Sequence, residues 1–333
     1  MRRIALLVET GATQSSIAIT LDMFNIARRY PAAADCQLDL FSIAGGKIAL
    51  SPQLFVATHA LPSQLDDYAA VILPGFFAND IEALDTQLQT HWPPVIDCLR
   101  RLSADTLIAA SCYGTFVLGA SGLLDGVNAT TTWWFQDEFR QRYPRVQLDP
   151  DQALADGGRC MTAGAMTAHT ELALHLLRRL FGVALARSVG GIMLIDGAKT
   201  SQRPFMSPRR DFADPLVQQA VDWLSAHEQE NVSTAQLAEL MCTSSRTLQR
   251  RFFAATGLSP LAYLQDLRIE HAKEMLETTR LSLEQIVEKI GYSDVSAFRR
   301  LFTRRAGLSP AQYRQHFCRR SRSSVPSVGG RIR

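Results

Sequence analysis

The sequence has no long apolar run and few cysteines, and each shortage excludes a class of protein. No apolar stretch approaches the roughly 18 residues of a membrane-spanning helix, so no membrane partner is expected. The apolar run at residues 4–8 stops at Glu9, below the roughly 7–15 residues of a secretory signal, and fits a buried first strand better. Six widely separated cysteines without CxxC spacing indicate reduced thiols and exclude a disulfide framework or a zinc site.

Motifs for common cofactors are also missing. The chain contains no Walker loop, no dinucleotide-binding GxGxxG and no HExxH pattern, so we expect no cofactor and no metal site. Its 333 residues are 47% hydrophobic and 20% charged, which excludes wholesale disorder. A chain of this length predicts two folded domains.

Charge is distributed unevenly along the chain. Residues 1–200 carry 15 basic and 19 acidic residues, a net charge of −4, whereas residues 201–333 carry 20 and 13, a net charge of +7. Arginine supplies 18 of the 20 basic residues in the second part, and its fixed fork of donors suits phosphates and guanine edges. The asymmetry suggests different partners for the two halves, although composition alone fits an ordinary solvated basic face equally well.

The front half alternates short apolar runs with helical stretches. Continuous apolar strands between helices predict an α/β domain, a flavodoxin-like sandwich whose mostly parallel sheet is covered on both faces. Ligands of such sheets bind beyond the carboxyl ends of the strands, which places Glu9 and the turns at 74–77 and 111–114 on one rim. The predicted strands are 3–9, 38–44, 69–73 and 106–111, and the predicted helices are 15–29, 80–103, 114–121, 134–142 and 166–181.

A change of composition separates the two halves. Residues 197–215 contain three prolines and three arginines without apolar periodicity, which predicts a linker. The sequence from 216 to 318 is helical throughout, and the basic, Gly/Ser/Pro-containing stretch 319–333 predicts a disordered tail. The predicted domains are therefore 1–196 and 216–318.

The rear half contains an internal repeat. Residues 251–260 match residues 301–310 at an offset of 50, and both copies end in Gly-Leu-Ser-Pro. Each copy follows a short helix, a turn and a capped second helix, which is the helix-turn-helix arrangement. Ser244 and Asp294 are the expected N-caps, because their side-chain oxygens accept from free helix amides.

The second helix of each unit separates core residues from exposed ones. The pairs Leu248 with Phe252 and Phe298 with Phe302 are four residues apart and are predicted to face the core. Arginine pairs with guanine and glutamine with adenine in the DNA major groove, so the opposite faces are predicted to bind DNA. The predicted DNA-binding residues are Ser244, Arg246, Thr247, Gln249 and Arg250 in the first unit and Ser296, Arg299 and Arg300 in the second.

These motifs resemble a known family. Residues 216–318 look like an AraC/XylS-type DNA-binding domain, and the resemblance implies an all-α domain with two helix-turn-helix units joined by a central helix at about 260–277. The matching segments are 248–252, 257–260, 290–294, 298–302, 307–310 and 313–314.

The front half carries a nucleophile-elbow pattern. Ala-Ser-Cys-Tyr-Gly at 110–114 lies between a predicted strand and a helix, with Cys112 where hydrolases have serine. Together with Leu-Leu-Asp-Gly at 123–126, Ala-Thr-Thr at 129–131 and Trp133, this pattern makes residues 1–185 resemble a PfpI/ThiJ-type, glutamine-amidotransferase-like domain. The combination of both domains resembles the GlxA group of transcriptional regulators.

The residues expected around a catalytic Cys112 are missing. Tyr113 and Thr132 stand where relatives place histidine, and residues 11–16 contain no carboxylate where many relatives have one. A catalytic thiol needs a base, so we expect no catalytic residue and a retained, non-catalytic elbow. The alternative is a Cys112-dependent hydrolase or amidase fused to a DNA-binding domain. The front histidines, none at a family position, are His59, His91, His169 and His175.

The favoured hypothesis is a cytoplasmic transcriptional activator with a metabolite-sensing front domain. The GlxA resemblance implies an amino-acid-derived or cationic effector, a homodimer, and double-stranded DNA and RNA polymerase as partners. Trp133 and Trp134 either pack at a helix start or offer an indole to a cation. His169 and Glu171 are predicted to lie in a solvated cap region. The predicted effector site comprises Glu9, Phe76, Cys112, Tyr113 and Trp133.

Overall fold

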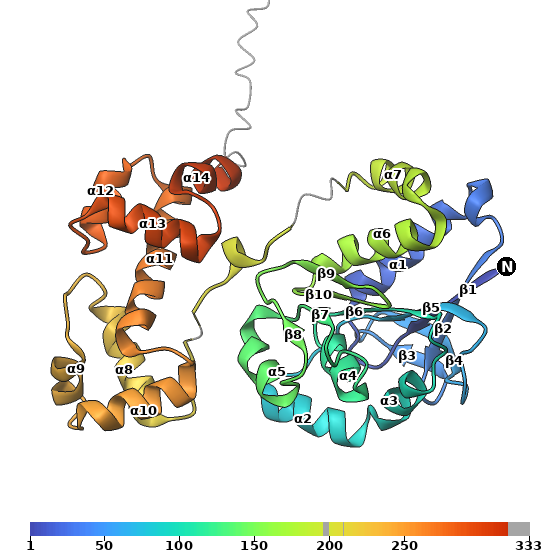
Figure 1. Cartoon of the computed structure of the whole chain (residues 1–333), viewed down its shortest axis with the longest axis horizontal. Coiled ribbons are helices and arrows are strands. Elements are labelled where there is room, and N and C mark those ends of the chain that lie inside the picture. The colour runs from blue at the N-terminus through green and yellow to red at the C-terminus, as the bar shows by residue number, and fades with distance from the viewer. Residues whose placement is uncertain (196–199, 209, 319–333) are drawn as a thin grey trace, which may run out of the picture. The chain divides into compact units, whose positions relative to one another are not determined.

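The computed structural model describes residues 1–195, 200–208 and 210–318. The chain separates into two compact units, a front unit, Met1–Gln202, and a rear unit, Arg203–Arg333 (Figure 1). The predicted tail, 319–333, lies outside the described residues, as do residues 196–199 and 209 of the predicted linker. Among the helices of the described residues, none combines the length and the hydropathy needed to cross a membrane.

An eight-stranded sheet forms the centre of the front unit. Its order is β3-β4-β2-β1-β5-β6-β10-β9, and only the edge strands β3 and β9 pair antiparallel. The mostly parallel α/β architecture predicted from the sequence is therefore confirmed. The strands are β1 (Arg2–Leu7), β2 (Cys36–Ser42), β3 (Gly46–Ala49), β4 (Phe55–Ala60), β5 (Tyr68–Leu73), β6 (Leu107–Ser111), β9 (Leu154–Gly157) and β10 (Cys160–Ala163).

Helices cover both faces of this sheet and bury a separate apolar cluster on each (Figure 1). The predicted helix 80–103 is two helices, because Pro93 and Pro94 lack the amides that a continuous helix would need. One face carries α1 (Gln14–Ala27), α6 (Ala168–Phe181) and α7 (Val183–Ile192); the other carries α2 (Ile81–Thr90), α3 (Pro93–Arg100), α4 (Gly114–Ser121) and α5 (Gln136–Arg142). A small sheet pairs β7 (Asn128–Ala129) with β8 (Gln147–Leu148).

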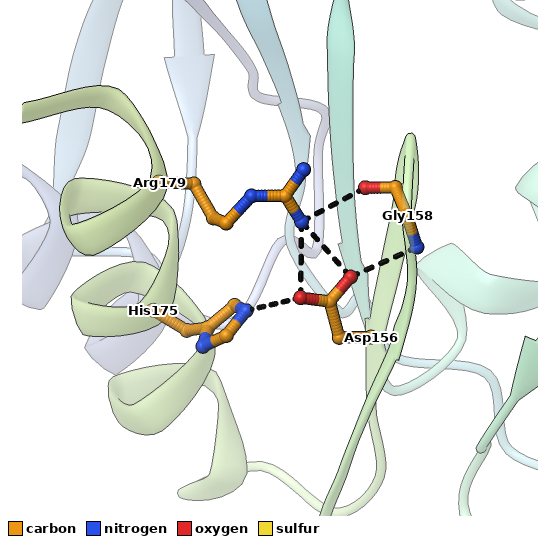
Figure 2. A network of polar contacts seen from close by, with 4 residues as sticks. All are labelled: Asp156, Gly158, His175 and Arg179. Carbon is orange, nitrogen blue, oxygen red and sulfur yellow. Dashed lines mark hydrogen bonds and ion pairs between the residues drawn. The ribbon is translucent and has the colours of Figure 1, made fainter. Parts of the chain in front are cut away.

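A polar cluster attaches the edge strand β9 to α6 (Figure 2). The Asp156 carboxylate accepts from Arg179 Nη1 at 3.0 Å and from the Gly158 amide at 2.9 Å, and it lies 2.7 Å from His175 Nε2. Burial alone would raise the pKa of Asp156, but these donors hold it below its ordinary value. The cluster therefore stabilises a sheet edge that has a neighbouring strand on one side only.

The rear unit contains seven α-helices in its described residues. Two apolar cores share the long central helix α11: its first half packs with α8–α10 and its second half with α12–α14 (Figure 1). The predicted all-α domain is thus confirmed. The helices are α8 (Pro215–Ala226), α9 (Thr234–Leu240), α10 (Ser245–Thr256), α11 (Pro260–Thr278), α12 (Leu283–Lys289), α13 (Val295–Ala306) and α14 (Pro310–Cys318).

The boundary between the units falls inside the predicted linker. The linker residues on either side of this boundary make contacts within their own unit. In the front unit, the Gln202 amide donates to Asp151 O at 2.7 Å. In the rear unit, Arg203 Nη1 donates to Arg304 O at 2.9 Å, and the Phe205 ring lies 5.6 Å from that of Phe317. The front unit therefore ends, and the rear unit begins, at anchored neighbouring residues.

Candidate effector site and DNA interface

Cys112 occupies a strained turn between β6 and α4. Its φ of 52° lies in the left-handed region, which costs an L-residue roughly 1–2 kcal/mol. The backbone around it compensates: its amide donates to Ala163 O and Gly164 O, both at 3.0 Å, and its carbonyl accepts from Thr115 Oγ1 at 2.6 Å. The residues at 110–114 therefore form the elbow geometry that the sequence pattern predicts.

The Cys112 thiol lies in a close-packed, nearly closed environment. The residue is 7% exposed, and a Cβ placed on Gly75 would lie only 2.6 Å from Cys112 Cβ. Glycine at 75 is thus what allows the two turns to approach each other. Burial raises the pKa of the Cys112 thiol to about 12, so the thiol is protonated at neutral pH and is a poor nucleophile.

A histidine does lie near the elbow, contrary to the prediction that His169 is solvated. His169 is 1% exposed, with Nδ1 2.8 Å from Ser111 Oγ and Nε2 2.8 Å from Thr20 Oγ1. Burial lowers its pKa to about 4, so the ring is neutral. The prediction was wrong because residue 169 faces inward from the first turn of α6 and joins α1 to β6.

Glu9 is buried at the rim and already has two partners. Its carboxylate, in a residue 5% exposed, accepts from the Ile43 amide at 2.6 Å through Oε1, and Oε2 lies 3.1 Å from His91 Nε2. The His91 side chain is 45% exposed. His91, which the sequence did not assign to the effector site, therefore lies between the buried carboxylate and solvent.

An aromatic cluster continues from His91 to the elbow. The His91 ring packs edge-on against Trp92, whose ring centroid lies 4.7 Å from that of Phe76. Phe76 meets Tyr113 at 5.9 Å, and the Tyr113 hydroxyl accepts from Trp134 Nε1 at 2.9 Å. Phe76 and Tyr113 therefore contact each other directly. Glu9 is connected to this aromatic cluster through His91 and Trp92.

Trp133 lies further out than the sequence suggested. It is half-buried, and its ring packs edge-on against Trp134 at 5.3 Å. Trp134 is the indole that contacts Tyr113. The sequence left open which of Trp133 and Trp134 faces the elbow, and it did not identify Trp92. Both Trp92 and Trp134 lie at a helix start, where apolar periodicity does not assign a facing direction.

Two buried polar atoms near the elbow have no hydrogen-bond partner among the described residues, namely Trp92 Nε1 and Thr132 Oγ1. Trp92 packs on Phe76, and Thr132 follows Thr131, whose hydroxyl lies 2.7 Å from that of Thr115 beside Cys112. An unpaired buried polar group costs about 1–3 kcal/mol. Such atoms mark places where a water molecule or a ligand would be stabilised.

The second helix of the first helix-turn-helix unit, α10, presents the predicted polar face. Ser244 caps it by accepting from the Thr247 amide at 3.2 Å, and its hydroxyl donates to Thr247 Oγ1 at 2.9 Å. Leu248 and Phe252 are fully buried, as their spacing predicts. The exposed residues of this face include Arg246, Gln249 and Arg250.

The corresponding helix of the second unit, α13, repeats the arrangement. Asp294 caps it by accepting from the Ala297 amide at 2.9 Å, and Phe298 and Phe302 are fully buried. Ser296, Arg299 and Arg300 are exposed on the opposite side. Both helices therefore combine a buried aromatic or aliphatic pair with an exposed basic face.

Comparison with known proteins agrees with this two-part architecture. The DJ-1/PfpI family profile matches residues 2–179, which is more than half of the chain. The chain belongs to the DJ-1/PfpI family. A second profile, of a helix-turn-helix domain, matches residues 237–316 of this DJ-1/PfpI family member, within its AraC-type rear unit.

The curated relatives of this DJ-1/PfpI protein include named HTH-type transcriptional regulators. CdhR of Pseudomonas aeruginosa is 28% identical over 231 residues, covering 68% of both chains. ArgR of the same species is 30% identical over 62% of this chain and 64% of its own. GlxA of Rhizobium meliloti is 26% identical over 63% of this chain and 67% of its own, so the GlxA-type resemblance is confirmed. The matches span about two thirds of these relatives' lengths.

Proposed function

We propose that this protein is a DNA-binding transcriptional regulator whose front unit senses a small molecule. The observation that carries the proposal is the pair of capped helices α10 and α13, each with a basic exposed face over a buried core, which we propose as the two recognition helices. Its homologues are HTH-type transcriptional regulators with AraC-type DNA-binding domains. A regulator must have access to DNA, so the proposal places the protein in the cytoplasm. Because the proposed role is in transcription, the proposal also includes RNA polymerase as a partner.

Each recognition helix would enter one major groove. Because successive major grooves on one face of B-DNA are about 34–36 Å apart, the operator should contain two unequal motifs about 10 bp apart. Arg246, Gln249 and Arg250 would read the first motif. The second would be read by Ser296, Arg299 and Arg300, while Ser244 and Thr247 would lie near the phosphates at the start of α10.

The effector would bind beside the elbow. Glu9, Phe76 and Cys112 each follow the carboxyl end of a parallel strand, where ligands of α/β sheets bind. The buried Glu9 carboxylate favours a cationic group, which would compete with His91 for Oε2. Tyr113 would form the aromatic wall, with Trp133 at its outer side. Amino-acid-derived molecules and cationic amines have the required charge.

The two unpaired polar atoms near the elbow restrict the chemical groups that the ligand would need. Trp92 Nε1 can only donate, so a ligand that reached it would need an acceptor such as a carboxylate or carbonyl oxygen. Thr132 Oγ1 can donate or accept. A compact metabolite carrying both a cationic group and an acceptor would therefore match the polar atoms around the elbow.

The elbow itself would serve binding rather than catalysis. Cys112 is protonated, and both ring nitrogens of His169 are taken up by the Ser111 and Thr20 hydroxyls. The relatives' names describe regulators, which supports a non-enzymatic role. A Cys112-dependent hydrolase or amidase is the competing function, and turnover of amide or ester substrates that stops in Cys112→Ala would establish it.

The signal would leave the front unit through Gln202. Its buried side chain accepts from the Ala165 amide at 2.9 Å and donates to Thr131 O at 3.0 Å. Residues 163–165 and 130–132 are the segments that also contact the elbow. A ligand that shifts these segments would loosen or tighten Gln202, and Arg203 follows it directly. The effector must favour one state over another, since equal affinity for both shifts nothing.

Three measurements test the parts of this proposal. Genome-wide mapping of sites bound by the full chain, followed by footprinting, should give paired motifs about one helical turn apart. Transcription from a mapped promoter should then respond to a member of a metabolite panel. Absence of sequence-specific binding would refute the DNA-reading role, and absence of any response would refute the sensing role. We also propose a homodimer, as the GlxA resemblance implies, and sedimentation of the full chain as a monomer at micromolar concentration would contradict it.

A further inference from the structure

A charged side chain is buried in the middle of the rear unit. Arg268, on α11, is only 6% exposed. Its Nε donates to Glu228 O at 2.5 Å and its Nη2 donates to Glu230 O at 2.8 Å, with Asn231 Oδ1 at 3.5 Å. All three acceptors lie in the loop between α8 and α9, so Arg268 fastens the central helix to the first helix-turn-helix half.

The same guanidinium also touches the second half. Its central carbon lies 5.1 Å from the ring centroid of Tyr292, a cation–π distance, and Tyr292 belongs to the turn between α12 and α13. The Tyr292 ring in turn lies 5.3 Å from that of Phe298, a core residue of the second recognition helix. One side chain therefore contacts the non-helical segment of each half.

The two halves also meet directly at this point. Gly291 has a φ of 78°, and a Cβ placed on it would lie 2.3 Å from Gln229 O. The α12–α13 turn thus lies against the α8–α9 loop so closely that only glycine fits. Because each half has its own apolar core, the orientation of the halves depends on α11 and on contacts such as this one.

We propose that Arg268 is a positioning residue that sets the spacing between the two recognition helices, and through it the operator spacing that the protein accepts. A buried guanidinium cannot reach a phosphate or a base, so its effect on DNA must come from orientation. Without it, the α8–α9 loop and the Tyr292 turn would lose their common donor and ring contact. The halves would then rotate about α11 and accept operators of several spacings. The proposal rests on the DNA-reading function above.

The test compares Arg268→Met with a matched arginine. Arg314 also donates to main-chain carbonyls, Leu281 O at 2.7 Å and Leu276 O at 3.4 Å, but within the second half only. The full chain of each variant is titrated with the selected operator and with versions whose half-site spacing is changed by 1 or 2 bp. We expect the wild type and Arg314→Met to prefer one spacing by about tenfold or more, since a mis-set second site loses base contacts.

Arg268→Met should reduce that preference to about threefold or less, because neither recognition helix loses a base-reading residue but their separation is no longer fixed. If Arg268→Met weakens binding equally at every spacing and keeps the wild-type preference, Arg268 is only structural and the proposal is wrong. A wild type without any spacing preference would instead contradict the two-groove binding mode.

A second variant covers the case in which Arg268→Met does not fold, as judged by its melting transition. Gly291→Ala leaves Arg268 in place but forces the turn away from Gln229. It should broaden or shift the preferred spacing while leaving each recognition helix intact. An unchanged preference in folded Gly291→Ala would overturn the idea that this contact sets the spacing.

Discussion

Nδ1 of His169 lies 2.8 Å from the hydroxyl of Ser111, one residue before Cys112. The imidazole is therefore next to the elbow in space, yet it is hydrogen-bonded away from the thiol on both of its nitrogens. The histidine lies near the cysteine but does not act as its base, because the imidazole is hydrogen-bonded to the Ser111 hydroxyl and not to the Cys112 thiol.

Because His169 is buried, it should make the stability of the fold sensitive to acid. Its pKa of about 4 lies below the ordinary value of 6.5, so between these values the unfolded chain binds the proton more readily. The free energy of unfolding should fall by up to about 3 kcal/mol as pH is lowered from 6.5 to 4. Urea unfolding of His169→Gln should show a smaller pH slope, whereas His59→Gln, at an exposed position, should keep the wild-type slope. Equal slopes in wild type and His169→Gln would contradict this.

Cys112 should be chemically inert and dispensable for DNA binding. Its pKa of about 12 leaves almost no thiolate at neutral pH, so alkylation of the native chain should label the exposed Cys242 well before Cys112. Cys112→Ser should bind DNA as the wild type does and keep much of the effector response. Mass spectrometry of alkylated peptides measures the order of labelling. Rapid labelling of Cys112, or a covalent adduct formed with the effector, would point to the hydrolase or reactive-cysteine alternative.

Substitutions on the recognition helices should act at separate parts of the operator. Arg250→Ala should cost about 1–3 kcal/mol of binding free energy and relax base preference within the first motif, and Arg299→Ala should do the same within the second. Arg178→Ala, an exposed change in the front unit, is the control and should leave the affinity unchanged. Gel-shift titrations against single-base operator variants measure both effects. If Arg250→Ala and Arg299→Ala relax the same position, the two-motif assignment is incorrect.

Substitution of Glu9 should weaken effector binding, whereas substitution of His91 should not. Glu9→Gln removes the negative charge but keeps an acceptor for the Ile43 amide, so a cationic effector should bind at least about tenfold more weakly. His91→Ala frees Oε2 and should leave effector affinity unchanged or raise it. Both variants should bind operator DNA normally. Calorimetric titration of the effector identified in the metabolite panel measures the affinities, and loss of binding in His91→Ala would show that His91 contacts the effector rather than competing with it.

Gln202 should be required for the response rather than for effector binding. Gln202→Ala removes the carboxamide that accepts from the Ala165 amide and donates to the surrounding oxygens of residues 130, 131, 150 and 152. It leaves buried groups such as the Ala165 amide unpaired, at about 1–3 kcal/mol for each unpaired group. The variant should still bind effector and operator but should activate transcription weakly or constitutively. Gln14→Ala, which loses one hydrogen bond in the same unit, is the control. A normal response in Gln202→Ala would show that the signal takes another route.

Much of the architecture could be predicted from local patterns. Apolar runs located β1, β2, β5 and β6, and the repeat at an offset of 50 located both helix-turn-helix units. The i, i+4 spacing of Leu248 with Phe252 assigned the buried face of α10 correctly, because a helix repeats every 3.6 residues whatever surrounds it. Short edge strands such as β3 and β9 have too few residues to show a period and were not predicted.

The sequence by itself determined most of the helices and the central strands, which helix faces are basic and which residues follow the strand ends. Only the tertiary structure decided which distant residues contact each other. His91 lies against Glu9, and Ser111 lies against His169. Gln202 binds the loops beside the elbow, and Arg268 lies between the two halves of the rear unit. Each of these contacts joins residues at least 24 positions apart that belong to different elements or loops. Local periodicity carries no information about such pairs, because their proximity is set by how the sheet and helices pack and not by spacing along the chain.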